Sequence, residues 1–224
     1  MVKREELDLD QRSQSFYNHI AGIYDGLMRV TEFFDAVEGI SERKSLIDQL
    51  ELNPGERFLE VASGTGSNLI LLGEDRKKSP RMVGIDISIE MLRRSQEKIA
   101  SHAVHANLIA ANAAHLPFPP EKFDAVLHFG GINRFSNRAF AVNEMIRVAK
   151  PGARIIISDK CLLGRRALDW RHRLIKKIKP QLSVPPPLDL IPANVRNLEL
   201  NWIWGGSAYL IKFIKPGSGS KSAD

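Results

Sequence analysis

The sequence contains few of the residues that stabilise secreted or metal-binding domains. Cys161 is the one cysteine among 224 residues, which excludes an intrachain disulfide framework and any multi-cysteine zinc site. No apolar run is long enough to cross a bilayer, because the run Ile155–Ile157 ends at Arg154 and Ser158. Residues 1–10 are charged and lack the apolar stretch of a secretory signal. These absences favour a reducing, cytoplasmic setting, and no metal is expected.

The residues that are present are those of an ordinary globular protein, with 43% hydrophobic and 26% charged side chains. The net charge of +6 is unevenly placed along the chain. Residues 1–159 carry 20 basic and 22 acidic side chains, whereas residues 160–224 carry 12 basic and 4 acidic ones. Most of the excess lies within residues 165–179. This distribution argues against a protein coated with positive charge for general nucleic-acid binding.

Strand-like and helical segments alternate along the first 160 residues. Short apolar runs predict the strands, and apolar residues at helical intervals predict the helices between them. Ser88 is positioned to cap a helix, because Met91 and Leu92 begin an apolar face directly after it. Strands apolar enough to be covered on both faces predict a parallel sheet wrapped by helices. The expected strands are 57–61, 82–86, 107–111, 123–128 and 153–158, and the expected helices lie within 12–50, from about 67, from 88 and over 136–150.

The C-terminal part of the chain differs from this alternation. A basic amphipathic helix is expected over Arg165–Lys179, because apolar residues recur there every three or four positions. Its basic face is compatible with docking onto an anionic membrane or an acidic substrate, and equally with a solvated face of a helix packed over the site. Pro185–Pro187 forms a stiff connector. Two further runs, 195–204 and 207–214, predict a hairpin that ends the sheet.

In an open parallel sheet, ligands bind beyond the carboxyl ends of the strands. The first such end is followed by a glycine loop, in which Gly64 and Gly66 permit positive φ and a close approach of a ligand to the backbone. Glu60, near the strand end, favours a cationic or amino-bearing ligand and disfavours a pyrophosphate. Asp86 ends the second strand, where a carboxylate accepts hydrogen bonds from both ribose hydroxyls. Two glycines after a strand can also form only a tight turn, but Asp86 at this position favours a nucleoside site.

Two common nucleotide-binding motifs are absent from this loop. No Walker lysine follows the glycines, which excludes a P-loop. Leu69 stands where the dinucleotide fingerprint has its third glycine. The expected nucleoside ligand is therefore not a dinucleotide.

Four stretches of the chain carry motifs in a fixed order over roughly residues 55–160, and their combination is more specific than any single motif. The stretches are Leu59–Gly66, Val83–Ser88 with Met91 and Leu92, Leu116–Phe118 leading to Phe123 and Asp124, and Glu144–Gly152. Taken together, they resemble the class I S-adenosylmethionine-dependent methyltransferases. The resemblance implies an α/β fold, with a Rossmann-like, seven-stranded, mostly parallel sheet flanked by helices and the last two strands as an antiparallel hairpin at the edge.

Within that family the chain looks most similar to the ubiquinone/menaquinone C-methyltransferases and, second, to bacterial phospholipid N-methyltransferases. Phe16–Asp25 resembles the N-terminal lid of the former, and Phe129–Gly130 with Asn133 resembles its segment after the fourth strand. There are two departures from the family pattern. Asn112 replaces the usual acid, although its side-chain oxygen can still accept a hydrogen bond from an adenine amino group. Ile132 replaces an expected arginine, a departure that bears on quinone specificity.

The resemblance implies S-adenosyl-L-methionine as the cofactor and a role for each matched residue. The glycine loop would hold the methionine part, with Glu60 near its amino group, and Asp86 would bind the ribose. Ile87 would flank the adenine, whose edge would meet Asn112 and Ala113. The implied cofactor-binding residues are Glu60, Ala62, Ser63, Gly64, Gly66, Asp86, Ile87, Met91, Asn112, Ala113 and His128.

Methyl transfer is an in-line displacement at a sulfonium, so alignment and the exclusion of water supply much of the catalysis. A general base is needed only when the acceptor carries a proton at the attacking atom. His128, at a strand end, is the best placed candidate, and Tyr24 on the lid and Asn133 are also expected near the reaction. Further candidates are His19, His115 and Asp159.

The expected activity is methyl transfer to a small-molecule or lipid-like acceptor, with peripheral membrane contact through Arg165–Lys179 as an additional expectation. The alternatives are a phospholipid N-methyltransferase at a membrane surface and a non-catalytic S-adenosylmethionine-binding regulatory protein. No nucleic-acid partner is expected, since no motif for flipped-base chemistry is present. The expected division is lid helices in 1–50, a cofactor-binding core in 51–160, the basic helix and proline-rich cap in 161–194, the hairpin in 195–216 and a flexible tail in 217–224.

Overall fold

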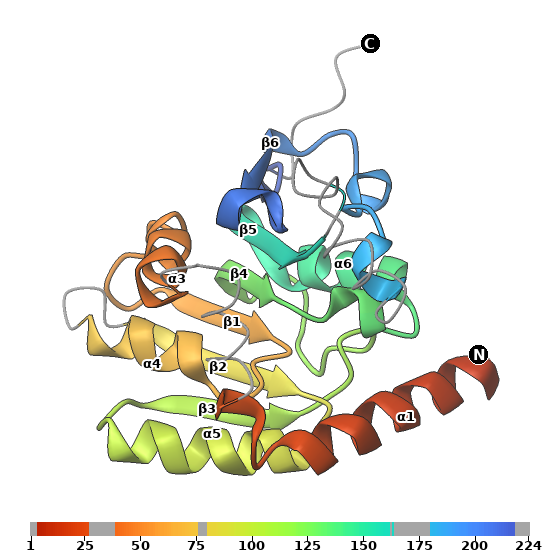
Figure 1. Ribbon diagram of the computed structural model, residues 1–224. Helices are drawn as coiled ribbons and strands as arrows, with labels where there is room; N and C mark the ends of the chain where they lie inside the picture. Colours follow the sequence, from red (N-terminus) through yellow and green to blue (C-terminus); the bar gives the residue numbers. More distant parts are fainter. Residues whose placement is uncertain (1–3, 27–38, 76–79, 162, 164–179, 218–224) are drawn as a thin grey trace.

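The computed structural model describes residues 4–26, 39–75, 80–161, 163 and 180–217, and its centre is one seven-stranded sheet (Figure 1). The strand order is β3-β2-β1-β4-β5-β7-β6. All pairs from β3 to β5 are parallel, whereas β7 pairs antiparallel with both β5 and β6. The predicted sheet with its antiparallel edge hairpin is thereby confirmed. The strands are β1 (Arg57–Val61), β2 (Arg81–Asp86), β3 (Ala106–Ala110), β4 (Phe123–Phe129), β5 (Ala149–Lys160), β6 (Arg196–Ile203) and β7 (Ala208–Ile214).

Helices cover both faces of the sheet, and each face has its own buried cluster. Leu46, Leu69 and Ile99 share one cluster on the face covered by α3, α4 and α5. Met145 and Val148 of α6 share the other cluster with β5 and β7. Because both faces are covered, the central strands are apolar on both sides, as the sequence indicates. The α-helices are α1 (Arg4–Ile20), α3 (Gly39–Asp48), α4 (Ser67–Glu74), α5 (Ile89–Ser101) and α6 (Arg138–Val148).

Short polar side chains begin two of these helices. The Ser88 hydroxyl accepts a hydrogen bond from the Met91 N–H, so the predicted cap of α5 is confirmed. The Asn137 side chain does the same for the Phe140 N–H at the start of α6. The start of α5 is therefore positioned by Ser88, two residues after the end of β2.

The end of α6 differs from the expected boundary. The helix stops at Val148, and β5 already begins at Ala149, which pairs with Phe123. The register of β4 against β5 then shifts, so that the next pair joins Ala125 to Arg154. Proline has no N–H to continue a helix, and Gly152 has a φ of 80°, so the Pro151–Gly152 pair forms an irregularity inside the strand.

One further helix, α1, crosses the carboxyl edge of the parallel strands instead of packing on a face of the sheet (Figure 1). Its side chains contact the segments that follow β2, β3 and β4. In the described part of the chain, no helix is both long and apolar enough to cross a membrane. The fold thus places one amphipathic helix over the edge where a parallel sheet binds its ligands.

Candidate functional site

The glycine loop after β1 is held against β2 and bends sharply. Ser63 donates its N–H to the Ile85 carbonyl at 2.8 Å, and Gly64 and Gly66 have φ values of 54° and 77°. A Cβ at Gly66 would lie 2.2 Å from the Ser95 hydroxyl oxygen of α5, so only glycine fits there. A Cβ at Gly64 would meet nothing within 4 Å. The loop is closely packed beneath Gly66 and has open space above Gly64, where a ligand can approach the backbone.

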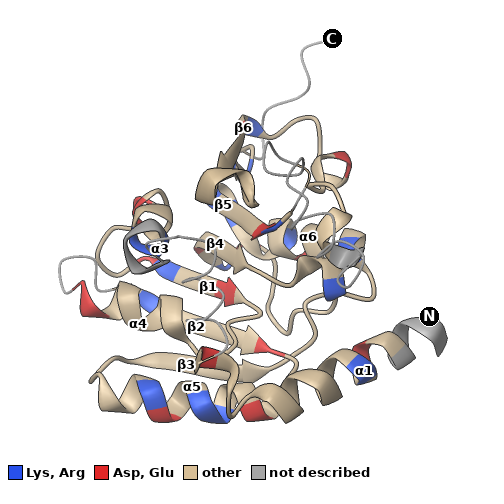
Figure 2. Ribbon diagram, in the orientation of Figure 1, with Lys and Arg blue, Asp and Glu red and all other residues tan. Residues whose placement is uncertain are grey.

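Asp86 lies at the end of β2, directly beside this loop, and is 7% exposed. One carboxylate oxygen accepts the Gly64 N–H at 2.9 Å, and the other accepts the Ser88 N–H at 2.8 Å. Burial raises the pKa of Asp86, and the backbone donors oppose that rise. Asp86 therefore joins the glycine loop to the start of α5. Figure 2 shows acidic residues at the tips of both β1 and β2.

Glu60 is the second acid of the site and is 1% exposed. Its Oε1 accepts a hydrogen bond from the Asn68 side-chain amide at 2.6 Å. Its Oε2 has no hydrogen-bond partner in the described part of the structure. Burial raises the pKa of Glu60 to about 8, although Asn68 and Arg43 act in the opposite direction. A cationic ligand would supply the missing partner and would favour the ionised form of Glu60, because a nearby positive charge lowers the pKa of a carboxyl group.

Three side chains of α1 tie this helix to the strand ends. Gln14 donates to the Ile87 carbonyl at 2.8 Å, and Asn18 accepts the Ser88 hydroxyl at 2.6 Å. Asp10 accepts the Asn112 side-chain amide at 2.6 Å. Since Ile87 follows β2 and Asn112 follows β3, the helix covers the edge where the resemblance expects the adenosine.

The chain after α1 returns toward the glycine loop. Asp25 accepts the Thr65 hydroxyl at 2.6 Å and forms an ion pair with Lys98 at 2.8 Å. Tyr24 is next to Asp25, and burial raises the pKa of its phenol, with smaller effects from Arg43 and Asp86. Tyr24 thus remains a neutral phenol at physiological pH, where it donates a hydrogen bond but does not serve as a base.

Asn112 and Ala113 lie where the sequence places them, but the bonding of Asn112 differs from the expectation. Its side-chain oxygen accepts the Ala114 N–H at 2.9 Å, and so stabilises its own turn. Its amide group donates to Asp10 of α1 instead of facing outward. Ala113 is 8% exposed and packs with the core. An adenine contact by the Asn112 oxygen stays a prediction, because that oxygen already accepts a backbone donor.

His128 is wholly buried in β4 and not at an open mouth of the site. Its Nδ1 lies 2.9 Å from the Val61 carbonyl, which only accepts, so Nδ1 carries the proton. Its Nε2 is a buried acceptor with no partner among the described atoms, and the ring packs edge-on against Phe135. Burial lowers the pKa of His128, so the ring is neutral.

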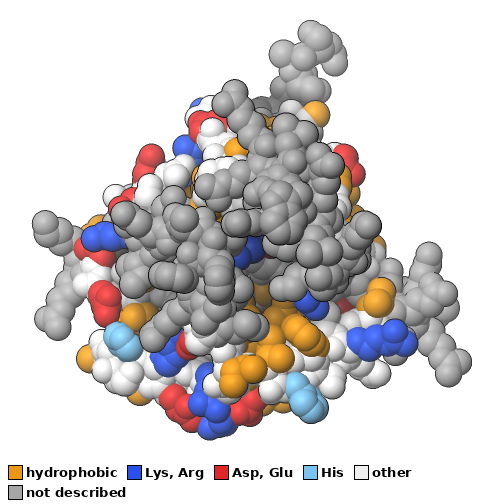
Figure 3. All heavy atoms as spheres, in the orientation of Figure 1, with side chains coloured by type: hydrophobic (Ala, Val, Ile, Leu, Met, Phe, Trp, Pro, Cys, Tyr) orange, Lys and Arg blue, Asp and Glu red, His pale blue; other side chains and the backbone are white. Residues whose placement is uncertain are grey.

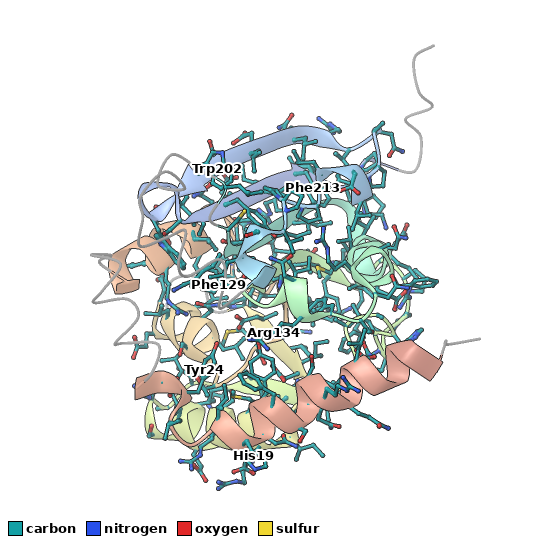
Figure 4. The ribbon with its side chains drawn as sticks, turned by 45° about the vertical axis from the view of Figure 1, so that its right-hand side comes forward. His19, Tyr24, Phe129, Arg134, Trp202 and Phe213 are labelled. Carbon is teal, nitrogen blue, oxygen red and sulfur yellow. The ribbon has the colours of Figure 1, made fainter. Side chains whose placement is uncertain are left out.

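The other catalytic candidates occupy different positions. Asn133 donates its N–H to Asp159 at 3.4 Å, and this bond joins the segment after β4 to the end of β5. The Asn133 side-chain oxygen accepts a hydrogen bond from the Arg138 guanidinium at 3.3 Å. His19 is exposed and points away from the sheet, whereas Tyr24 and Arg134 lie between α1 and the strand ends (Figure 4). His115 is exposed, and its ring lies near that of Phe140 in α6. Catalytic roles for His128, Asn133 and Tyr24 stay predictions.

Ile87 lies between β2 and α5, and Met91 lies in the first turn of α5. Met91 is 1% exposed, and its N–H is used by the Ser88 cap. Ile87 is partly exposed and contributes its carbonyl to Gln14. The predicted basic helix Arg165–Lys179 lies outside the described residues.

A groove of about 410 Å³ runs between α1 and the segment after β4. Figure 3 shows hydrophobic side chains gathered along α1, which carries the exposed Leu9 and Phe16. The Arg134 guanidinium lies 4.6 Å from the Phe16 ring centroid. The groove is lined by Leu9, Arg12, Ser13, Phe16, Asn133, Arg134 and Phe135. It combines apolar rings with cationic and polar groups, which suits an amphipathic molecule.

Sequence reasoning missed the polar residues that connect the site to its surroundings. Asn68 donates a hydrogen bond to Glu60, and Arg43 contacts Glu60 indirectly, through its hydrogen bond to Asn68. Asn18 accepts a hydrogen bond from Ser88. Asn68 carried a usable signal, because it is the second residue of the helix after the glycine loop and lies near the end of β1. Arg43 and Asn18 gave none, since both come from N-terminal segments whose packing is set by tertiary structure.

Comparisons with known proteins identify the family of the chain. Residues 6–181 match the ubiE/COQ5 methyltransferase family. The chain is 33% identical over 153 residues to the ubiquinone/menaquinone biosynthesis C-methyltransferase UbiE of Geotalea daltonii, covering 66% of this chain and 63% of that relative. It is 30% identical over 167 residues to the demethylmenaquinone methyltransferase of Anoxybacillus flavithermus, covering 73% and 69%. The chain thus spans less than two thirds of the Geotalea relative's length.

The fold is also that of solved structures with low sequence identity. Phosphoethanolamine N-methyltransferase 2 of Haemonchus contortus, solved in complex with S-adenosyl-L-methionine, superposes with a TM-score of 0.67 at 13% identity. The match covers 79% of this chain and 52% of that protein. At this identity the likeness shows the fold alone.

The raised pKa of Glu60 predicts a dependence of stability on pH. In the unfolded chain Glu60 ionises near 4.5, whereas the folded protein keeps it protonated up to about pH 8. Between these values the folded state binds the extra proton, so the contribution of Glu60 to stability falls as pH rises. Glu60→Gln keeps the shape of the protonated carboxyl and lacks this dependence. We expect the melting temperature of Glu60→Gln, measured relative to the parent, to increase from pH 5 to pH 8.

Glu97→Gln is the matched control, because the Glu97 side chain is 54% exposed on α5. Its melting temperature relative to the parent should change little over the same range. A difference between Glu60→Gln and the parent that is independent of pH would contradict the buried, protonated state of Glu60.

Proposed function

The chain belongs to the ubiE/COQ5 methyltransferase family, and we propose that it transfers a methyl group from S-adenosylmethionine to a small, lipid-like acceptor. The observation that carries this proposal is the buried Glu60 carboxyl beneath an open glycine loop, with one oxygen still lacking a partner. The family relatives named as quinone methyltransferases support the same reading.

The residues of the site fit each part of this cofactor. The unpartnered Glu60 oxygen matches the ammonium of the methionyl group, and the open space at Gly64 admits the chain that carries it. Asp86, at the end of the second strand, is positioned to accept hydrogen bonds from the ribose hydroxyls. Each of its oxygens already accepts one backbone N–H and has a further lone pair for a hydroxyl. Ile87 and Ala113 provide apolar contact for the adenine.

When bound, the cofactor supplies an electrophilic methyl group on a sulfonium. The chain's own contribution is then to align the acceptor and to exclude water. Tyr17, Tyr24 and Phe16 form a contiguous aromatic group over the site, with centroid distances of 5.3 and 6.4 Å. Together with the hydrogen bonds of Gln14 and Asn18, they close the edge of the sheet. A covered site lowers the local dielectric and strengthens each charge–charge contact within it.

An acceptor that loses a proton on methylation needs a base near the reacting atom. His128 is neutral and its Nε2 can accept a proton, but the side chain is wholly buried, with its ring packed edge-on against Phe135. It would serve as a base only if the acceptor reached this buried atom. Tyr24 is a neutral phenol and would orient the acceptor as a hydrogen-bond donor. We assign Asn133 to the wall of the groove, where it lies beside Phe135.

The acceptor is proposed to be a quinol-type ring with an apolar tail, methylated at carbon. The groove beside α1 supports this choice, because Leu9, Phe16 and Phe135 line it and Arg134 lies at its polar part. Ile132 stands where the family pattern has an arginine, and Arg134, two residues later, would supply the positive charge instead. Peripheral membrane contact through Arg165–Lys179 belongs to the same proposal, since such an acceptor resides in lipid.

Asp86→Ala tests the cofactor site. Removal of a charged hydrogen-bond partner costs roughly 1.5–3 kcal/mol, so S-adenosylhomocysteine affinity should fall about 10- to 100-fold in calorimetry. Glu97→Ala, at an exposed position of the neighbouring helix, should bind like the parent. Unchanged affinity in Asp86→Ala would contradict the assigned ribose contact.

Transfer of a radiolabelled methyl group tests the acceptor. With labelled S-adenosylmethionine, we expect label in a short-chain demethylmenaquinol and none in phosphatidylethanolamine vesicles. Phe16→Ala, which removes an exposed ring from the groove, should raise the acceptor KM with little effect on cofactor affinity. Label in the phospholipid would indicate a phospholipid N-methyltransferase, and tight cofactor binding without any transfer would favour a regulatory protein.

A further inference from the structure

Asp159 lies near the carboxyl end of β5, two strands away from β1 and its buried acid. Its Oδ1 accepts the Lys160 N–H at 2.7 Å. Its Oδ2 lies 3.4 Å from the N–H of Asn133, a residue that lines the groove beside α1. The residue is partly exposed, and no side chain in the described part of the chain forms an ion pair with it. Backbone donors thus hold this carboxylate at the wall of the groove.

Three polar side chains project from one face of the sheet at this end. His128 of β4 pairs with Ile157 of β5, and Asp159 pairs with Tyr209 of β7. Side chains two residues apart on a strand share a face, so His128, Asp159 and Tyr209 lie on the same one. The His128 Nε2 and the Tyr209 hydroxyl are buried and have no partner among the described atoms. Asp159 is therefore the one of these three that a ligand reaches from the groove.

The turn after β4 leaves room for a ligand next to the end of β5. Gly130 and Gly131 have φ values of 84° and 98°, and Gly130 donates its N–H to the Ser158 carbonyl at 2.7 Å. A Cβ at Gly130 would meet nothing within 4 Å. The Tyr17 hydroxyl of α1 lies 3.5 Å from the position that a Cβ at Gly131 would occupy. The open space at Gly130 therefore has a phenol of α1 on one side and the residue before Asp159 on the other.

The titratable groups around Asp159 are neutral. Burial raises the pKa of the Tyr17, Tyr24 and Tyr209 phenols, and the negative charge of Asp159 adds to the rise in each. Burial lowers the pKa of His128, although Asp159 acts in the opposite direction. The three phenols are hydrogen-bond donors at neutral pH and above it, and the neutral His128 ring is buried.

The positive charges near Asp159 come from η1 (Ile132–Arg134) and from the start of α6. Arg134 lowers the pKa of Tyr17, and Arg138 lowers that of Tyr209, so both oppose the effect of Asp159 on these phenols. Cys161 is buried and donates its thiol to the Val184 carbonyl at 3.3 Å. Among the described residues at this end of the sheet, Asp159 is the accessible group that can take a proton.

We propose that Asp159 is the catalytic base that removes the ring hydroxyl proton of the acceptor, which binds in the open space at Gly130. The inference rests on the proposed function, since it concerns the same quinol-type acceptor. Tyr17 donates a hydrogen bond to the acceptor oxygen from the opposite side. Lys160 and Asn133 orient the carboxylate through their backbone N–H groups.

The proposed step balances in protons and electrons. The hydroxyl proton moves to the Asp159 carboxylate, and the electron pair of the broken O–H bond stays on oxygen and is shared with the ring. The ring carbon then forms a bond to the methyl group as the bond from that methyl group to sulfur breaks, and the electron pair of that bond remains on sulfur. The ring carbon finally loses its hydrogen to water as a proton, and Asp159 returns its proton to the oxygen.

Asp159→Asn tests this role, because the variant keeps the shape and the acceptor oxygen but is not a base. In anaerobic single-turnover transfer to a short-chain demethylmenaquinol at pH 7, we expect the rate to fall about 100-fold or more. An unperturbed phenol titrates near pH 10, so the acceptor ionises unaided as pH rises. The deficit of Asp159→Asn relative to the parent should therefore shrink about tenfold for each pH unit between pH 7 and pH 9.5. Calorimetry should show S-adenosylhomocysteine affinity changed less than about twofold, which also shows that the variant is folded.

Asp189→Asn is the matched control, because Asp189 is exposed in η4 (Leu188–Leu190). Its rate should equal that of the parent at each pH, and Asp159→Glu, which keeps a carboxylate, should recover part of the lost rate. An unchanged rate in Asp159→Asn, or a loss that does not vary with pH, would overturn the inference. Loss of S-adenosylhomocysteine binding in Asp159→Asn and Asp159→Glu would overturn it as well, since Asp159 would then support the fold. A parent chain that binds S-adenosylhomocysteine but transfers no methyl group would contradict the proposed function itself.

Discussion

Two carboxyl groups buried at the ends of adjacent parallel strands are the constraint around which the site is organised. Glu60 and Asp86 are 1% and 7% exposed, and burial raises the pKa of both. Asp86 is stabilised by backbone N–H groups of the glycine loop and of the start of α5. Among the residues that the structure describes, Glu60 accepts a hydrogen bond from the Asn68 amide alone. This asymmetry explains why one acid holds the protein's own backbone in place and the other is left for a ligand.

Hydrogen bonds to these two acids help to position the neighbouring elements. The glycine loop must bend so that the Gly64 N–H reaches Asp86, and that bend places α4 with Asn68 against Glu60. Ser88 then caps α5, and its hydroxyl donates a hydrogen bond to Asn18 of α1. Helix α1 therefore reaches the site through polar contacts with strand ends, and not by packing into either hydrophobic cluster. Such contacts can break and re-form at little cost, as the proposed binding of the cofactor beside this helix requires.

The sequence predicts the sheet well, because its signals are local. β1 has the expected bounds, the other parallel strands begin or end within a few residues of expectation, and Ser88 caps α5 through a short-range bond. The start of β5 was not predictable, since Ala149 joins the sheet through its pairing with Phe123 on another strand. The bonds of Asn112 and the burial of His128 likewise depend on partners 102 and 67 residues away. Motif spacing places such residues near the site but does not say which of their atoms are available.

In the proposed site, the two buried acids, the glycine loop and α1 bind the cofactor together. Hydrogen exchange measured by mass spectrometry, with and without S-adenosylhomocysteine, distinguishes this shared site from binding at the glycine loop alone. We expect added protection in three separate segments, residues 62–68, 86–92 and 9–20, with little change in the edge strand β6. Protection confined to the glycine loop, with α1 exchanging as in the ligand-free protein, would rule out the shared site.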